Sequence, residues 1–163
     1  MSRKLSQRRT GIEKGGNLKL INVLVTAVGG PTALGVLKCL RNVAGIRLIG
    51  VDSQSLTAGN QFCDVFYSIP RISNPKEYIS VITKIVEKEK IDVIFPTLQD
   101  EISIYMELRN GIAANVALPK SDTFEVLVNK EKLYQHLEQS DLMQYVPRYH
   151  VFETGTELQR IAK

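Results

Sequence analysis

Residues 19–41, KLINVLVTAVGGPTALGVLKCLR, decide the fold. Residues 19–28 form a nearly continuous aliphatic and β-branched run, which is typical of a strand buried on both faces of a parallel sheet. Gly29-Gly30-Pro31-Thr32 follows as a turn. From Ala33 onward, aliphatic residues recur at helical spacing with basic residues on the opposite side. Strand, glycine turn and helix predict the first half of a βαβ unit.

The chain continues to alternate between strand-like and helix-like patterns. One helix is predicted to begin after Asn74, with Pro75 in its first turn, and to end near Lys90; another runs from Asp100 to Asn110. This alternation predicts an α/β fold: a Rossmann-like doubly wound parallel sheet of about five strands with helices on both faces. The common strand order of such sheets, 3-2-1-4-5, is taken for it. The four further strands are predicted at residues 47–52, 65–69, 91–96 and 115–118.

The pattern becomes purely helical after residue 120. Two helices follow in succession, and Asn129 is placed to cap the second. Residues 149–152 have the pattern of a strand, and residues 158–161 that of a helix just beginning. We therefore predict three parts: a flexible basic leader at 1–18, a Rossmann-like domain at 19–120, and a helical region at 121–163 that is cut off within an element.

The composition favours a folded cytoplasmic protein. Of 163 residues, 44% are hydrophobic and 23% are charged, and no apolar run approaches the roughly 18 residues that would span a bilayer. The net charge of +4 comes entirely from residues 1–18, because residues 19–163 contain 16 basic and 16 acidic side chains. A nucleic acid is therefore not an expected partner, and neither is a membrane.

Cysteine and histidine give no sign of a metal site. Cys39 and Cys63 sit in apolar stretches without metal-ligand spacing, so we interpret them as reduced structural thiols. His136 and His150 have no cysteine or carboxylate nearby at ligand spacing. No metal ligand is predicted in this chain.

The candidate site follows from the predicted strand order. Ligands of open parallel sheets bind beyond the carboxyl ends of the strands, where the strand order reverses. Here the crevice lies between the first and fourth strands, where Gly29 and Gly30 meet the loop that carries Thr97, Asp100 and Glu101. The glycines let a ligand approach the backbone, and the loop offers one hydroxyl and two carboxylates. These five residues are the predicted substrate site.

Structural interpretations remain open for the same residues. The glycines could serve only the tight turn. Asp100 could only cap its helix and Glu101 could only interact with the helix dipole; these two contacts together would contribute about 1–2 kcal/mol to stability. Asp52 ends the second strand, where NAD-binding folds place a ribose-binding carboxylate. An NAD(P)- or nucleotide-sugar-binding module is therefore the alternative function, although residues 29–35 do not fit G-x-G-x-x-G. A regulatory or protein-interaction domain without a ligand is the third possible function.

A set of short motifs occurs in order along residues 20–160. The motifs are residues 22–30, 50–52, Ala58, Asp64, Pro70, 94–97, 100–101, 129–130 and 146–147. Together they resemble the N-terminal region of ATP-grasp enzymes, most closely the carbamoyl-phosphate-synthase-like members. In that family a Rossmann-like domain precedes a two-lobed ATP-grasp module. The resemblance therefore implies that residues 121–163 hold linker helices and the truncated start of an ATP-grasp lobe.

The resemblance also implies a reaction and its participants. ATP-grasp ligases use ATP and Mg²⁺ to activate a carboxylate as an acyl phosphate, which an amine or another nucleophile attacks. The partners implied are a small carboxylate or amine substrate and the C-terminal ATP-grasp lobes; a homo-oligomer is also compatible. Gly29 and Gly30 would lie near the substrate, with Thr97, Asp100 and Glu101 in the same cleft.

Lys130 matches the basic residue that reaches nucleotide phosphate in the family. Asn129 stands before it where the family usually has Asp. The glycine-rich lid and the acidic magnesium ligands of the family would lie beyond Lys163. We therefore expect this chain alone to be inactive and to hold neither ATP nor Mg²⁺ tightly.

Overall fold

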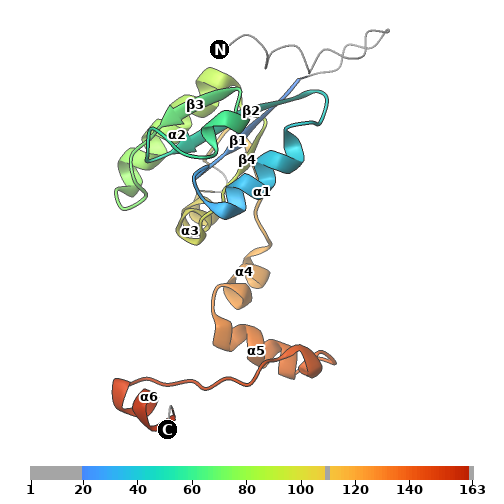
Figure 1. Cartoon of the computed structure of the whole chain (residues 1–163), viewed down its shortest axis with the longest axis vertical. Helices are drawn as coiled ribbons and strands as arrows, with labels where there is room; N and C mark the ends of the chain where they lie inside the picture. Colours follow the sequence, from blue (N-terminus) through green and yellow to red (C-terminus); the bar gives the residue numbers. More distant parts are fainter. Residues whose placement is uncertain (1–19, 109–110, 162–163) are drawn as a thin grey trace. The chain divides into compact units, whose positions relative to one another are not determined.

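The computed structural model describes residues 20–108 and 111–161. The chain forms two compact units, and the boundary between them in the sequence lies between Leu118 and Pro119. The colours of Figure 1 follow the sequence and locate both units. The predicted leader at 1–18 and Asn110, the predicted end of one helix, lie outside the described residues.

A five-stranded parallel sheet forms the centre of the first unit, in the order β3-β2-β1-β4-β5. This confirms the α/β class and the predicted strand order. The first strand and the two strands at one edge are shorter than predicted, and Ile91 lies in the core although it precedes its strand. The strands are β1 (Ile21–Val25), β2 (Ile46–Asp52), β3 (Val65–Ser68), β4 (Val93–Phe95) and β5 (Asn115–Val116).

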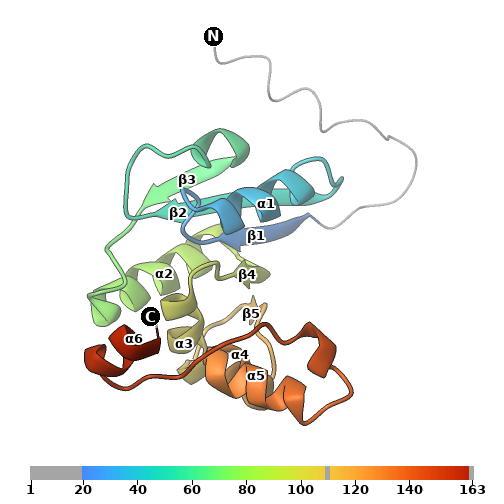
Figure 2. The same cartoon turned by 60° about the horizontal axis from the view of Figure 1, so that its bottom comes forward.

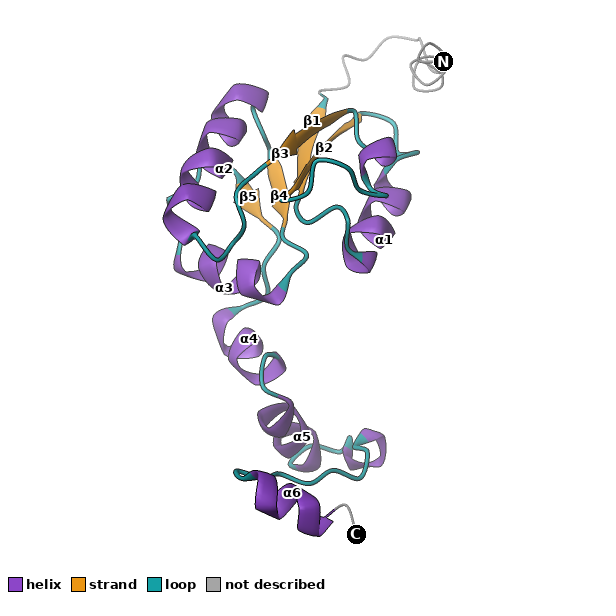
Figure 3. Cartoon of the chain, turned by 60° about the vertical axis from the view of Figure 1, so that its left-hand side comes forward, coloured by secondary structure: helices purple, strands orange, loops and turns teal. Residues whose placement is uncertain are grey.

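Helices cover both faces of the sheet, as Figure 3 shows. Successive residues of β1 alternate between two cores: Leu24 packs with α2 and α3, whereas Val23 and Val25 pack with α1. A strand buried on both faces explains why residues 19–28 show no polar alternation. The helices are α1 (Pro31–Leu40), α2 (Pro75–Glu89) and α3 (Gln99–Glu107).

Asn74 and Lys90 flank α2 as predicted, whereas α3 begins one residue earlier than predicted. Asn74 precedes α2 as expected, but its side chain donates to Glu77 and makes no cap hydrogen bond. Lys90 ends α2 in the left-handed conformation, with φ 51°. Leu98 is the N-cap residue of α3, so Asp100 lies inside the helix and does not cap it.

One close backbone contact fixes the segment between β2 and β3, which contains the short 3-10 helix η2 (Asn60–Phe62). A Cβ atom at Gly59 would lie only 2.0 Å from the carbonyl oxygen of Val28. Only glycine fits this position without a backbone shift. The contact holds the β2–η2 segment against the turn that follows β1.

The second unit contains α4 (Ser121–Leu127), α5 (Lys130–Glu138), the 3-10 helix η3 (Met143–Tyr145) and α6 (Gly155–Ile161). Figure 2 labels the three α-helices. Asn129 caps α5 as predicted, because its side chain accepts from the Lys132 backbone N–H at 3.2 Å. The predicted strand at 149–152 is wrong. These residues have no strand to pair with in the described part of the second unit, and Tyr149 packs on Tyr134 instead, with ring centroids 4.8 Å apart.

Among the described residues, no helix combines the length and the hydropathy that crossing a bilayer would require.

Candidate functional site

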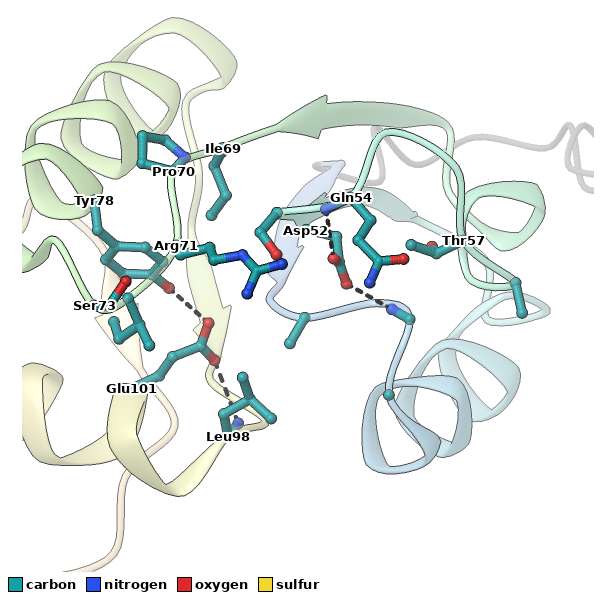
Figure 4. A pocket seen from close by; sticks show the side chains of 16 residues that line it. Asp52, Gln54, Thr57, Ile69, Pro70, Arg71, Ser73, Tyr78, Leu98 and Glu101 are labelled. Atoms are coloured by element: carbon teal, nitrogen blue, oxygen red, sulfur yellow. Dashed lines mark hydrogen bonds between the residues drawn. The ribbon is translucent and has the colours of Figure 1, made fainter.

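A pocket of about 640 Å³ lies at the carboxyl ends of β1, β2 and β3. Its lining comes from the β1–α1 turn, the β2–η2 segment, the β3–α2 segment and the first residues of α2 and α3 (Figure 4). This volume is in the range of small-molecule sites, and the carboxyl edge is where parallel sheets bind ligands. The pocket is the candidate site of the first unit.

Asp52 holds the glycine turn at one side of the pocket. Its Oδ2 accepts the N–H of Gly29 at 2.8 Å, and its Oδ1 accepts the N–H of Gln54 at 2.9 Å. The N–H of Gly30 donates to the carbonyl of Ala27 at 2.9 Å. The amides of both glycines are therefore engaged within the protein, and the turn offers backbone surface to a ligand rather than a cradle of N–H donors.

Glu101 forms the opposite side of the pocket and is only 3% exposed. Its Oε2 accepts the Thr26 hydroxyl at 2.5 Å, and its Oε1 accepts the Tyr78 hydroxyl at 2.9 Å. Backbone N–H groups of Leu98 and Thr97 also point to Oε2, at 3.3 and 3.4 Å. This carboxylate joins the end of β1, α2 and the start of α3 beside the pocket.

Two buried tyrosines complete this network. The rings of Tyr78 and Tyr105 meet edge to face with centroids 6.5 Å apart, and their hydroxyl oxygens are 3.5 Å apart. Burial raises the pKa of Tyr78 far above its ordinary value, and the neighbouring Tyr105 and Glu101 raise it further. Burial also raises the pKa of Tyr105. Both hydroxyls therefore keep their protons at neutral pH, and Tyr78 remains a donor to Glu101.

The five predicted substrate residues differ in their positions. Gly29, Gly30 and Glu101 line the pocket. Thr97 is outside the lining, and its hydroxyl donates to the Thr26 carbonyl at 2.8 Å. Asp100 is exposed on the first turn of α3 and is also outside the lining. The structure thus brings together three of the five residues in the pocket lining, whereas Thr97 lies on the β4–α3 loop and Asp100 on the first turn of α3.

Several lining residues were missed from the sequence. Arg71 and Ser73 follow β3, and Gln54 follows β2. The prediction looked only at the crevice between β1 and β4, whereas the pocket extends across the ends of β2 and β3. A signal for them was present in the sequence. Pro70 was the predicted end of the third strand, and ligands of parallel sheets bind beyond the carboxyl ends of the strands, so the residues after Pro70 were candidates.

Lys130 belongs to the second unit. It is the first residue of α5 and is exposed. His136 and His150 are exposed in the same unit. Within residues 20–108 and 111–161, no group of three or more His, Cys, Asp or Glu side chains is suited to hold a metal ion.

The model of the PylC-like N-terminal domain family matches residues 23–118. This chain belongs to that family. The match runs from β1 to the end of the first unit, and it confirms the resemblance to the N-terminal domain of an ATP-grasp enzyme.

One solved structure similar to this chain is the glycinamide-RNase-transformylase T from Mycobacterium tuberculosis. The two are 14% identical, with a TM-score of 0.49, over 75% of this chain and 35% of that chain. This chain thus spans about a third of the length of the similar protein. No curated protein matches the chain significantly.

Proposed function

We propose that the first unit is the substrate-side domain of an ATP-dependent carboxylate–amine ligase, of the carbamoyl-phosphate-synthase-like kind. The observation that carries this proposal is the pocket at the carboxyl ends of β1, β2 and β3 in a chain of this family. The pocket is large enough for a small carboxylate or amine substrate and is lined by both backbone and polar side chains.

The proposed substrate site keeps all five predicted residues, in two roles. Gly29 and Gly30 border the ligand, because both line the pocket. Glu101 and Thr97 hold the crevice in shape through Thr26, to which both are hydrogen-bonded. Asp100, exposed one residue before Glu101, is free to contact a substrate group that extends past the rim of the pocket.

ATP, with Mg²⁺, would supply the phosphoryl group that turns the substrate carboxylate into an acyl phosphate for attack by the amine. Lys130 fits a contact to nucleotide phosphate, because its ammonium is exposed at the N-terminal end of a capped helix. The described residues do not fit Mg²⁺, since they contain no cluster of metal ligands. We propose that the complete ligase supplies that site, and that the present chain is inactive alone.

The geometry favours this function over an NAD(P)- or nucleotide-sugar-binding module. Asp52 does end β2, but both of its oxygens accept backbone N–H groups. A dinucleotide pyrophosphate needs free amides in the glycine turn, and those of Gly29 and Gly30 are already used. We therefore expect no saturable NADH binding to this chain by fluorescence titration; binding that Asp52→Ala weakens would support the module instead.

A pocket-narrowing variant tests the substrate assignment. Ser73 lines the pocket, so Ser73→Trp should raise the KM for the carboxylate or amine substrate in the ligase that contains this domain. Ser80→Trp is the matched control, because Ser80 is exposed on α2 but lies outside the lining. An equal effect of both variants, or none of either, would show that the pocket is not the substrate site.

A further inference from the structure

One charged side chain of the pocket differs from the other two in its hydrogen bonding. Three charged side chains line the pocket: Asp52, Arg71 and Glu101. Both oxygens of Asp52 accept backbone N–H groups, and Glu101 accepts two hydroxyls and two N–H groups. Both carboxylates are therefore held by donors of the protein itself.

Arg71 differs from both carboxylates. Its side chain is exposed, and its guanidinium has no hydrogen bond or ion pair within the described residues. Figure 4 shows this side chain reaching from the β3–α2 segment into the space between Asp52 and Glu101. A guanidinium presents N–H donors in a planar fork that matches the two oxygens of a carboxylate.

We propose that Arg71 is a specificity-determining residue of this pocket and that it binds a carboxylate group of the ligand. The inference rests on the proposed function, since it assigns the ligand class of the same site. Charge complementarity favours a carboxylate over a phosphate at Arg71: a carboxylate group places one negative charge against the guanidinium, whereas a phosphate dianion places two in the space that Asp52 and Glu101 also line. The side chains of Ser73 and Gln54 add a hydroxyl and an amide that can orient the rest of the ligand.

Calorimetric titration of the 163-residue chain tests this assignment with defined probes. Glutarate and N-acetylglycine should bind saturably at millimolar concentration, whereas the corresponding amides should not, and inorganic phosphate should bind more weakly than glutarate. Arg71→Gln should lower the glutarate affinity by about 10–100-fold, the range of hydrogen bonds to charged groups. The glutarate affinity of Arg71→Lys should lie between those of the original chain and Arg71→Gln, because lysine keeps the charge but lacks the planar fork of N–H donors.

Lys76→Gln is the matched control for charge. Lys76 is exposed on α2, five residues from Arg71 and outside the pocket lining, so its loss changes the net charge equally. Its affinity for glutarate should equal that of the original chain. Equal losses in Arg71→Gln and Lys76→Gln would reduce the effect to general electrostatics and overturn the inference.

Further outcomes separate this inference from the proposed function. If Ser73→Trp abolishes glutarate binding while Arg71→Gln leaves it unchanged, the pocket stands and the assignment of Arg71 fails. No saturable binding of either carboxylate, amide binding as tight as carboxylate binding, or tighter binding of phosphate would also overturn it. Mass spectrometry after phenylglyoxal treatment gives a second readout: glutarate, and not glutaramide, should slow the modification of Arg71.

Discussion

Replacing Glu101 by alanine should destabilise the first unit far more than replacing its neighbour Asp100. The two carboxylates are adjacent in the sequence, but Glu101 is 3% exposed whereas Asp100 is exposed on the surface of α3. From the sequence alone, the two together were expected to contribute about 1–2 kcal/mol as cap and dipole contacts. The buried network changes that expectation for Glu101.

The magnitude follows from the donors that lose their acceptor. Tyr78 would keep only the Tyr105 hydroxyl at 3.5 Å, so its own hydroxyl would be left nearly unsatisfied in the core, at about 1–3 kcal/mol. Thr26 loses a hydrogen bond to a charged group, which contributes about 1.5–3 kcal/mol, although its hydroxyl can turn to the Phe95 carbonyl at 3.4 Å. We therefore expect Glu101→Ala to cost about 3–5 kcal/mol and Asp100→Ala about 0.3–1 kcal/mol.

Urea denaturation of the chain, followed by circular dichroism, measures both variants. Glu101→Gln is a useful third variant, because it keeps one acceptor oxygen but turns an amide donor toward other donors. Its cost in free energy of unfolding should lie between those of Glu101→Ala and Asp100→Ala. Equal costs for Glu101→Ala and Asp100→Ala, or a cost below about 1 kcal/mol for Glu101→Ala, would refute the account of the network, since such values are those of an exposed first-turn carboxylate.

Three further predictions test separate features of the fold: the end of α2, the close contact at Gly59 and the burial of Cys63. Lys90→Gly should stabilise the chain by about 0.5–1 kcal/mol in urea melts, because Lys90 ends α2 at φ 51°, where glycine is unstrained; a loss of stability would contradict that geometry. Gly59→Ala should cost about 2–3 kcal/mol, since its Cβ would meet a backbone carbonyl at 2.0 Å, whereas Gly35→Ala, with nothing within 4 Å, should gain about 0.5–1 kcal/mol. Burial, and then the neighbouring Asp64, raises the pKa of the Cys63 thiol to about 11. Its contribution to stability should thus be complete below about pH 9 and lost as the pH rises toward 11, and at neutral pH a thiol reagent should modify exposed Cys39 well before Cys63; equal labelling rates would contradict the burial of Cys63.

The sheet could be predicted because its signals are local. A strand buried on both faces, such as β1, leaves an uninterrupted apolar run, and Pro31 and Pro75 mark the first turns of α1 and α2. The predicted strand at 149–152 failed because a strand also needs a partner, and apolar pattern alone does not show whether one is present.

The site was predictable only in part, for a different reason. The position of the crevice follows from strand order, which explains why Gly29, Gly30 and Glu101 were found. The burial of Glu101 depends on Tyr78, 23 residues away. The position of the Arg71 side chain depends on the path of the β3–α2 segment. Such contacts between distant segments leave no periodic signal in the sequence.

In the proposed ligase, the pocket of the first unit binds the carboxylate or amine substrate, and the nucleotide binds elsewhere with the help of Lys130. Steady-state kinetics of the ligase that contains this domain test both halves in one measurement. Ser73→Trp should raise the apparent KM for the carboxylate or amine substrate and leave that for ATP unchanged. Lys130→Ala should raise the apparent KM for ATP and leave that for the carboxylate or amine substrate unchanged. A rise in the apparent KM for ATP with Ser73→Trp, or unchanged ATP kinetics with Lys130→Ala, would contradict the account.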